Sequence, residues 1–267
     1  MPFMKGYKME KITAKDNEKI KRYVKLLSSK KARDEQGVFV IEGVKLLLEA
    51  VRSETQIEQI FVTEKFLPRF EELALENVSA DVFLVSEAVE GKIASSLSPQ
   101  GVYAVCKKLD KPLNLDKIDN NGCFIALWDL QDPGNVGTIF RVADAMGISG
   151  VILSEKCCDV YNLKTLRSAM GSLFRMPFLI TDLEKFIVEN KGKLASYSAV
   201  VDKDATPVTK IDFNKSSLVV IGNEGNGLSK EQADLCDKKI TIPMKGSAES
   251  LNAAMAATVI IWEMSKK

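Results

Sequence analysis

Apolar positions near the start of the chain repeat at intervals of three and four residues, the spacing of one face of a helix. Ile20, Tyr23, Val24 and Leu27 follow this pattern, which predicts a helix over residues 16–27. Beyond it, strand-like runs alternate with helical patterns. The predicted strands cover residues 37–41, 57–62, 82–85 and 102–106, and the predicted helices cover residues 44–51, 67–75 and 88–97. This alternation predicts a compact α/β domain of about a hundred residues.

A polar stretch separates this region from a second alternating one. Residues 107–122 contain Pro112 and the turn-forming run Asn120-Asn121-Gly122, and we place an interdomain linker at residues 109–122. Further strands are predicted at residues 124–130, 151–154, 178–181, 194–198, 218–222 and 239–242, and a final helix at residues 250–265. These strands are continuous apolar runs, as expected when helices cover both faces of a parallel sheet. The sequence therefore predicts an α/β protein with domains at residues 1–108 and 123–267.

The composition is that of a globular protein, with 46% hydrophobic and 27% charged residues among 267. The apolar runs are too short to span a bilayer. Lysines interrupt the N-terminal region where a signal peptide would need an apolar core. We therefore expect a cytoplasmic protein without membrane contact.

The chain contains no histidine and five cysteines. The missing histidine excludes serine–histidine and cysteine–histidine hydrolases and argues against a catalytic zinc site, because it removes the commonest general base and the commonest neutral metal ligand. The cysteines have no CxxC spacing, and their number is odd. We expect reduced thiols and no bound metal.

The net charge of +1 conceals an uneven distribution. Residues 1–33 carry nine lysines and two arginines against three acidic residues, so the remainder of the chain is acidic on balance. A basic arm on an acidic body favours attraction to a polyanion. The alternative interpretation is a solvated, lysine-rich helix with no partner.

Three segments of the second region carry residues suited to chemistry. In the first, residues 129–141, a strand ends in a Pro-Gly turn and a helix begins near Asn135, with Asn135 and Arg141 in its first two turns and Gly137 between them. This places Asn135 and Arg141 at the carboxyl edge of the sheet, where open α/β sheets bind ligands. An ordinary strand–turn–helix with an asparagine cap and a surface arginine would show the same pattern.

The second segment is the loop Gly222-Asn223-Glu224-Gly225-Asn226-Gly227, which follows an apolar strand. Its glycines allow close backbone approach to a ligand. The GxxGxG spacing differs from the dinucleotide fingerprint, and the loop lacks the lysine of a phosphate-binding loop. A tight turn without a ligand is the alternative.

The third segment begins at Ile242-Pro243-Met244 and continues through Ser250-Leu251-Asn252 into an alanine-rich helix. Ser250 is a reasonable N-cap for that helix. The alanines allow close packing, either against the sheet or against a second copy of the chain. A core helix with no other role is the alternative.

In this order and near the C-terminus, the three segments resemble the SpoU (TrmH-type) branch of the SPOUT methyltransferases over residues 123–267. The segment from Lys30 to Leu48 more loosely resembles the substrate-binding domain that precedes the catalytic domain in many members. The resemblance implies a C-terminal trefoil-knotted α/β domain with a parallel sheet, preceded by a small α/β RNA-binding domain. It also implies a homodimer formed through the C-terminal domain, and S-adenosylmethionine as the cofactor.

The resemblance further assigns roles to individual residues. Those implied for cofactor binding are Gly222, Asn223, Glu224, Gly227, Ile242, Met244, Leu251 and Asn252. Those implied for catalysis are Asn135, Arg141, Glu224, Ser250 and Asn252. RNA contacts are expected at Lys30, Lys31, Arg33 and Arg141.

The expected reaction is methyl transfer to a ribose 2′-hydroxyl of RNA, which is mainly a positioning task. A guanidinium is difficult to deprotonate, so we expect Arg141 to hold the adjacent phosphate and polarise the hydroxyl while the proton leaves to phosphate or water. Ribosomal RNA is favoured over transfer RNA because of the extra N-terminal domain.

Two rival interpretations remain. One is a non-catalytic RNA-binding or ribosome-assembly protein on the same fold. The other is a Rossmann-type methyltransferase that acts on small molecules or proteins, although such an enzyme would have its glycine loop early in the domain.

Overall fold

The computed structural model describes residues 3–4, 7–75, 78–109, 113 and 122–266. The chain forms two compact units. One comprises residues 1–110 together with 161–174, and the other comprises residues 111–160 and 175–267. Most of the predicted linker at residues 109–122 lies outside the described residues. The first unit also takes in residues 161–174, which the sequence pattern had assigned to the second domain.

The N-terminal unit is built on a mixed five-stranded sheet with the order β3-β6-β5-β7-β4. Its strands are β3 (Glu10–Ile12), β4 (Val38–Glu42), β5 (Ile57–Thr63), β6 (Asp81–Val85) and β7 (Val102–Lys107). Strand β7 runs antiparallel to both β4 and β5, and the other pairs are parallel. A two-stranded ribbon of β1 (Phe3–Met4) and β2 (Tyr7–Lys8) precedes this sheet. Four of the five sheet strands were predicted from the hydrophobic pattern, whereas β3 was not.

Helices surround this sheet. They are α1 (Glu18–Ser28), α2 (Lys30–Gln36), α3 (Val44–Arg52), α4 (Leu67–Glu72), α5 (Glu87–Ile93) and α7 (Leu163–Ala169), followed by the 3-10 turn η3 (Ser172–Phe174). Asn17 caps α1, which buries Ile20, Tyr23 and Leu26. The Tyr23 hydroxyl donates a hydrogen bond to the Ile41 carbonyl at 3.1 Å. The predicted helix face was therefore nearly right, although Leu26 is more deeply buried than Val24 or Leu27.

The C-terminal unit contains a seven-stranded sheet with the order β10-β9-β8-β13-β11-β14-β12. Its strands are β8 (Cys123–Leu127), β9 (Gly150–Ser154), β10 (Phe178–Thr181), β11 (Ala195–Ala199), β12 (Thr206–Pro207), β13 (Ser217–Ile221) and β14 (Lys238–Thr241). Every neighbouring pair is parallel, which confirms the predicted parallel sheet. The two central strands, β8 and β13, are buried along their whole length.

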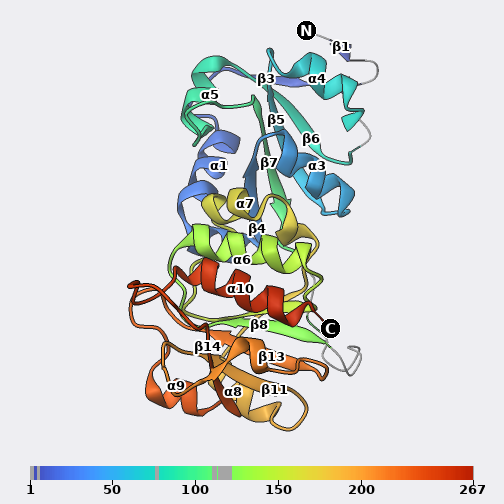
Figure 1. Cartoon of the computed structure of the whole chain (residues 1–267). Coiled ribbons are helices and arrows are strands. Elements are labelled where there is room, and N and C mark those ends of the chain that lie inside the picture. Colours follow the sequence, from blue (N-terminus) through green and yellow to red (C-terminus); the bar gives the residue numbers. More distant parts are fainter. Residues whose placement is uncertain (1–2, 5–6, 76–77, 110–112, 114–121, 267) are drawn as a thin grey trace. The chain divides into compact units, whose positions relative to one another are not determined.

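Helices lie on both faces of this sheet (Figure 1). Helices α6 (Pro133–Ala145) and α10 (Ala253–Met264) pack against each other on one face, and α8 (Leu183–Glu189) and α9 (Lys230–Asp234) lie on the other. After β13 the chain crosses beyond β11 to form β14, and it then returns across the sheet to form α10 beside α6. Three segments distant in sequence consequently converge at one edge. The trefoil knot implied by the family resemblance stays a prediction.

Candidate active site

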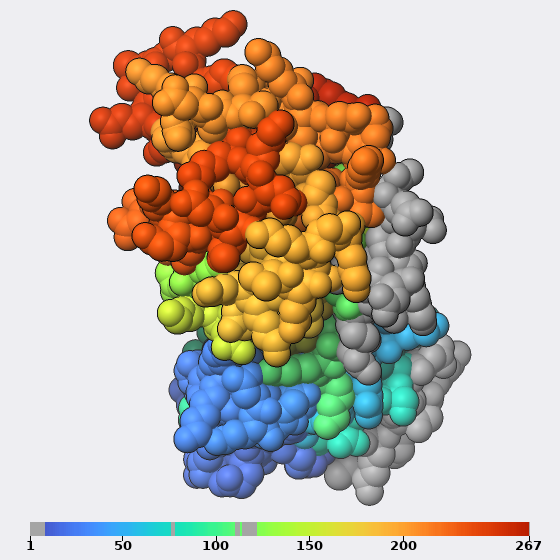
Figure 2. Space-filling view, turned by 90° about the horizontal axis from the view of Figure 1, so that it is seen from below, coloured from blue at the N-terminus to red at the C-terminus, as the bar shows by residue number. Residues whose placement is uncertain are grey.

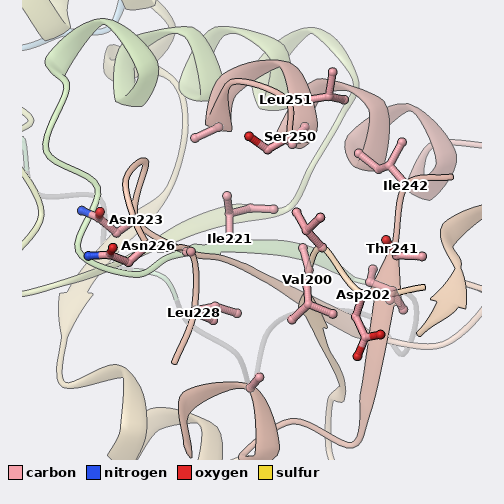
Figure 3. A pocket seen from close by; sticks show the side chains of 18 of the residues that line it. Val200, Asp202, Ile221, Asn223, Asn226, Leu228, Thr241, Ile242, Ser250 and Leu251 are labelled. Carbon is pink, nitrogen blue, oxygen red and sulfur yellow. The ribbon is translucent and has the colours of Figure 1, made fainter. Parts of the chain in front are cut away.

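A cavity of about 730 Å³ lies at the carboxyl edge of the C-terminal sheet. Its walls come from the ends of β11, β13 and β14, from the loops that follow them, and from the start of α10. Ile221 and Leu228 lie on one side of the opening, Val200 and Thr241 on another, and Ser250 and Leu251 above them (Figure 3). The C-terminal segments that supply these walls, coloured orange to red, gather on one surface of the molecule (Figure 2).

Most of the predicted cofactor-binding residues line this cavity. They are Gly222, Asn223, Glu224, Gly227, Ile242, Met244 and Leu251. Of the predicted catalytic residues, Glu224 and Ser250 line it, whereas Asn135, Arg141 and Asn252 do not. The sequence pattern did not identify the opposite wall, which includes Val200, Asp202 and Thr241. Val200 and Asp202 follow β11 and Thr241 ends β14, and none of the three carries a distinctive sequence signal.

The glycine loop turns back on itself at Gly222. A Cβ atom added to Gly222 would lie 2.3 Å from the Gly227 carbonyl carbon and 2.4 Å from the Leu228 nitrogen. The Gly227 N–H donates to the Asn223 carbonyl at 2.9 Å, and Gly227 has a φ of +66°. Only glycine fits at Gly222, because the approaching atoms belong to the backbone and cannot move aside as a flexible side chain would. The first glycine therefore sets the shape of the cavity wall.

Glu224 connects the glycine loop to the turn before α6. Its carboxylate accepts hydrogen bonds from the main-chain N–H groups of Gln131 and Asp132 and from the Asn135 side-chain amide, each at 3.0 Å. The Asn135 side-chain oxygen in turn accepts a hydrogen bond from the Asn252 amide at 3.1 Å. One continuous hydrogen-bond network therefore joins residues from all three segments that the sequence analysis selected.

The caps of α6 and α10 explain why these two asparagines are available to the network. Asp132 caps α6 by accepting a hydrogen bond from the Asn135 N–H at 2.9 Å, so Asn135 lies inside the first turn and its side chain is free to bridge to other segments.

The predicted N-cap of the last helix was wrong. Asn252, not Ser250, caps α10, and its side-chain oxygen accepts from Ala254 N–H at 2.9 Å and Met255 N–H at 3.3 Å. Asparagine supplies both an acceptor for the cap and an amide donor for Asn135; serine has no amide.

Asp129, which was not among the residues selected from the sequence, shapes the turn that presents the Gln131 and Asp132 N–H groups. Its φ is +57°, a conformation that Asp tolerates better than most residues. The Ser154 hydroxyl donates to its carboxylate at 2.6 Å, and the Asn223 amide donates to its carbonyl at 2.8 Å. Asp129 thereby joins the end of β8 to both β9 and the glycine loop.

The Glu224 carboxylate is stabilised in its charged form. Burial raises its pKa, but the hydrogen bonds from Gln131, Asn135 and Asp132 outweigh that effect and hold the pKa below its usual value. Because the pKa of Glu224 is lower in the folded state than in the unfolded state, the ionised carboxylate stabilises the fold. This contribution is fully present above the unfolded-state pKa of about 4.3. The stabilisation is lost as the pH falls through the lower folded value.

We therefore expect Glu224→Gln to loosen the loop and weaken cofactor binding by about tenfold at neutral pH, because a neutral amide is a weaker acceptor than a carboxylate. The difference in thermal stability between this variant and the wild type should shrink as the pH is lowered below about 4. Calorimetric titration and melting curves across pH measure both effects. Glu184→Gln, at an exposed position at the start of α8, is the matched control. If Glu224→Gln and the wild type had equal melting temperatures at pH 7, the assigned role of Glu224 would be contradicted.

Arg141 stands apart from the network. It lies in the third turn of α6, beyond the first two turns in which it was predicted, because the helix already begins at Pro133. Its side chain is exposed and makes no hydrogen bond or ion pair with the described residues. Arg141 lies six positions after Asn135 along the helix, so the two side chains leave the helix roughly a third of a turn apart. The structure thus brings Asn135, Glu224 and Asn252 together and leaves the Arg141 guanidinium free at the surface.

The residues expected to contact RNA in the N-terminal unit divide into two groups. Lys30 and Lys31 are exposed on α2. Arg33 differs from the expectation, because it is only 4% exposed and its guanidinium donates to the main-chain carbonyls of Leu26 and Leu27. It satisfies the last turn of α1, where carbonyl groups lack helical partners, and it is therefore a structural residue.

Within the described part of the chain, no cluster of acidic or cysteine side chains has the arrangement of a metal site, and no helix is long and apolar enough to cross a membrane. None of the five cysteines forms a disulfide in the structure. Burial raises the pKa of the Cys236 thiol to about 12, so this group is uncharged at neutral pH. The polar groups that line the cavity are carboxylates, amides, hydroxyls, main-chain groups and the ammonium groups of Lys230 and Lys239.

Comparisons with known proteins identify the family to which the chain belongs. The sequence model of the SpoU rRNA Methylase family matches residues 122–262, and that of the MRM3-like substrate binding domain matches residues 17–104. The chain is 30% identical to the 23S rRNA (guanosine(2553)-2′-O)-methyltransferase RlmP of Bacillus subtilis, covering 96% of this chain and 99% of that protein. It is also 30% identical to the 23S rRNA (uridine(2479)-2′-O)-methyltransferase of Streptomyces viridochromogenes, covering 92% and 89% of the two chains.

Solved structures show the same architecture. The AdoMet-bound rRNA methyltransferase from Sinorhizobium meliloti is 31% identical and superimposes with a TM-score of 0.85 over 96% of this chain and 97% of its own. The AdoMet complex of the SpoU methyltransferase AviRb from Streptomyces viridochromogenes is 28% identical, with a TM-score of 0.84 over 94% and 97%. The fold and the converging segments define an RNA methyltransferase. The chain belongs to the SpoU rRNA methylase family.

Proposed function

We propose that this protein transfers a methyl group from S-adenosylmethionine to a ribose 2′-hydroxyl of ribosomal RNA. The observation that carries the proposal is the cavity in which the glycine loop, the loop after β14 and the start of α10 meet, braced by the Glu224–Asn135–Asn252 network. Relatives aligned over nearly the whole chain are named as ribose methyltransferases of 23S rRNA. This supports ribosomal RNA over transfer RNA as the substrate.

The cavity suits S-adenosylmethionine. Its volume of about 730 Å³ falls within the range of small-molecule sites, roughly 300–1,000 Å³. Ile221, Leu228, Ile242 and Leu251 supply apolar contacts, and the folded-back loop at Gly222 leaves main-chain groups beside them. When bound, S-adenosylmethionine supplies an electrophilic methyl group on a sulfonium. An apolar wall favours loss of that positive charge during transfer.

Residues of this chain divide the remaining tasks. Main-chain groups at Gly222, Ile242 and Leu251 hold the cofactor, while Asn223, Gly227 and Met244 complete the walls around it. Glu224, Asn135 and Asn252 fix the three segments relative to one another, and Ser250 presents a hydroxyl at the cavity. Arg141 holds the phosphate next to the target ribose and polarises its hydroxyl. The proton leaves to that phosphate or to water, because a guanidinium remains charged at neutral pH.

Transfer of labelled methyl from S-adenosylmethionine tests the activity directly. Purified protein is incubated with 23S rRNA lacking the modification, with transfer RNA and with bulk protein, and the labelled RNA is digested to identify the methylated atom. We expect label on a ribose oxygen of 23S rRNA. Label on a base, on transfer RNA or on protein, or no label on any acceptor, would overturn the proposal.

The exposed lysines of α2 are proposed to contact RNA phosphates. Lys31 has only a loose pairing with Glu35 at 3.8 Å, and an exposed pair of this kind contributes little stability. Replacing Lys30 and Lys31 together with alanine should weaken rRNA binding and reduce the dependence of log Kd on log salt by about 1.4, which corresponds to two contacts with single-stranded phosphates. Filter binding across a salt series measures the slope. An unchanged slope contradicts this contact, and cofactor affinity is the control.

We further propose a homodimer formed through α10. Met255, Val259 and Trp262 occupy successive turns of one helix face and are 61%, 36% and 53% exposed. An exposed apolar stripe of this kind is typical of an association surface.

Trp262→Glu should give a monomer in sedimentation analysis, because a charge would have to be buried in the dimer interface. Val188→Glu, on α8 at the opposite sheet face and 53% exposed in the wild type, should leave the dimer intact. Monomeric wild-type protein would contradict the proposal.

A further inference from the structure

A groove on the N-terminal unit passes the start of α3. Two hollows of about 230 and 340 Å³ share Lys45 and Gln100 as lining residues, so they meet at the first turn of this helix. The Gln100 side-chain oxygen accepts a hydrogen bond from the Val44 N–H at 2.9 Å. This bond holds the loop between α5 and β7 against the helix. The groove is therefore built by two segments more than fifty residues apart in the sequence.

The groove carries a surplus of positive charge. Its ionisable lining residues are Lys45, Arg52, Arg69, Arg167, Glu42 and Glu49. Both acidic groups have cationic partners, since Arg167 lies 2.6 Å from Glu42 and Arg52 lies 3.5 Å from Glu49. The side chains of Lys45 and Arg69 are exposed and have no hydrogen bond or ion pair within the part of the chain that the structure describes. Two uncompensated cations consequently face the groove.

Glu42 organises one wall of the groove and does not cancel these charges. It is 7% exposed and accepts hydrogen bonds from the main-chain and hydroxyl groups of both Ser95 and Ser96. Burial raises its pKa, but those hydrogen bonds and the Arg167 charge outweigh burial and keep the carboxyl ionised. Its negative charge is thus directed inward, to Arg167 and the serines. The same bonds fix the loop that continues to Gln100.

Leu97 projects from this loop into solvent. Its side chain is fully exposed, and it lies between Ser96 and Ser98, both of which line the groove. A single exposed leucine is ordinary on a protein surface. Beside unpaired cations, however, it adds an apolar contact to a positively charged surface. The main-chain N–H groups of Lys45 and Leu46 add further donors, because the first turn of a helix leaves its N–H groups without helical acceptors.

We propose that this groove binds an unpaired segment of the substrate RNA, with phosphates on Lys45 and Arg69 and an unstacked base against Leu97. The inference rests on the proposed function, in which RNA is the substrate. An unpaired loop or bulge suits the surface better than a continuous duplex, because bases in a duplex are stacked and do not offer their faces to an apolar side chain. Cationic side chains position the backbone through phosphates, and Leu97 distinguishes unpaired from paired RNA.

Charge reversal in the groove tests the phosphate contacts. The double variant Lys45→Glu/Arg69→Glu in the full chain is compared with wild type by filter binding to a 23S rRNA transcript and to a short blunt-ended RNA duplex. We expect at least about a tenfold loss of affinity for the transcript and a salt slope lower by about 1.4. The control Lys191→Glu/Lys193→Glu makes the same charge change at exposed positions after α8 and should retain wild-type affinity within a few fold.

Leu97→Asp tests the base contact separately. It should weaken binding to the transcript without changing duplex binding by more than the control does. Cofactor affinity and melting temperature verify that each variant is folded, and Lys45→Arg/Arg69→Lys should restore most of the affinity. The groove proposal would be overturned if Lys45→Glu/Arg69→Glu kept the wild-type RNA affinity and salt slope, or if the control variant lost as much affinity. So would a loss of duplex binding in Leu97→Asp equal to its loss of transcript binding.

Failure of the groove and failure of the proposed function give different results. If the wild type methylates the transcript and the groove variant binds and reacts equally well, the groove proposal fails and the proposed function stands. If the groove variant loses RNA binding but the wild type transfers no methyl group, the groove stands and the proposed function fails. If the wild type binds no RNA, both fail.

Discussion

Replacing Gly222 with alanine is expected to abolish measurable binding of S-adenosylmethionine, a loss of at least about a hundredfold in affinity. The new Cβ would lie 2.3 Å from the Gly227 carbonyl carbon, and the neighbouring atoms are all backbone. The loop from Asn223 to Gly227 must therefore open, and the wall it forms moves with it. Overpacking of this kind also costs about 1–3 kcal/mol of folding stability. Calorimetric titration measures the binding, and melting curves measure the stability.

Two glycine controls separate this effect from a general consequence of losing a glycine. Gly225→Ala lies in the same loop, where the added Cβ would approach only the Asn223 side-chain oxygen at 3.4 Å, so it should lose much less affinity. Gly91→Ala lies in α5 with no atom near the added Cβ and should leave cofactor binding unchanged. Wild-type affinity in Gly222→Ala would show that the folded-back loop does not shape the cofactor site.

The second large effect is expected for Arg141→Lys, which should lower kcat about a hundredfold, or about 2.7 kcal/mol of transition-state stabilisation. Lysine keeps the charge but lacks the planar fork that can bind a phosphate and a hydroxyl together. Because Arg141 does not line the cavity, the affinity for S-adenosylmethionine should be unchanged. Single-turnover methyl transfer and calorimetric titration measure the two quantities independently.

Arg175→Lys is the matched control for this substitution. Arg175 pairs with Asp144 of α6 at 2.7 Å, and lysine preserves that charge pairing. We expect nearly wild-type rates for this variant. Near-full activity in Arg141→Lys would remove Arg141 from the reaction and leave the phosphate-holding role to another cation.

The elements of the fold were largely predictable because hydrophobic patterning is a local property. Six of the seven strands in the C-terminal sheet were predicted at nearly their observed positions, and β12, which has only two residues, was not. The helix α2 was missed because its boundaries depend on single residues, the Ser29 cap and Gly37 with a φ of +63°, and not on an apolar stripe. The N-cap of α10 was wrongly placed for a similar reason, since serine and asparagine are both good caps and only their contacts distinguish them.

The candidate site was likewise predictable only where the signal lies in the local sequence. Motifs at Gly222, Glu224 and Asn252 could be selected from the sequence, because unusual residues follow predicted strands or precede a predicted helix. Asp129 could not, since an aspartate after a strand is common and its left-handed conformation appears only in three dimensions. Arg33 was expected to contact RNA with the neighbouring lysines, yet burial directs its guanidinium to the end of α1.

The sequence by itself determined the α/β class, the parallel sheet, the absence of histidine chemistry and the three segments that define the family. Tertiary structure decided which of their residues meet. It joined Glu224, Asn135 and Asn252 in one network and separated Arg141 from the cavity. It also grouped residues 161–174 with the N-terminal unit, where Arg167 pairs with Glu42. The physical reason is that hydrophobic periodicity depends on neighbours along the chain, whereas a hydrogen bond between residues about ninety or more positions apart depends on the path the chain takes across the sheet.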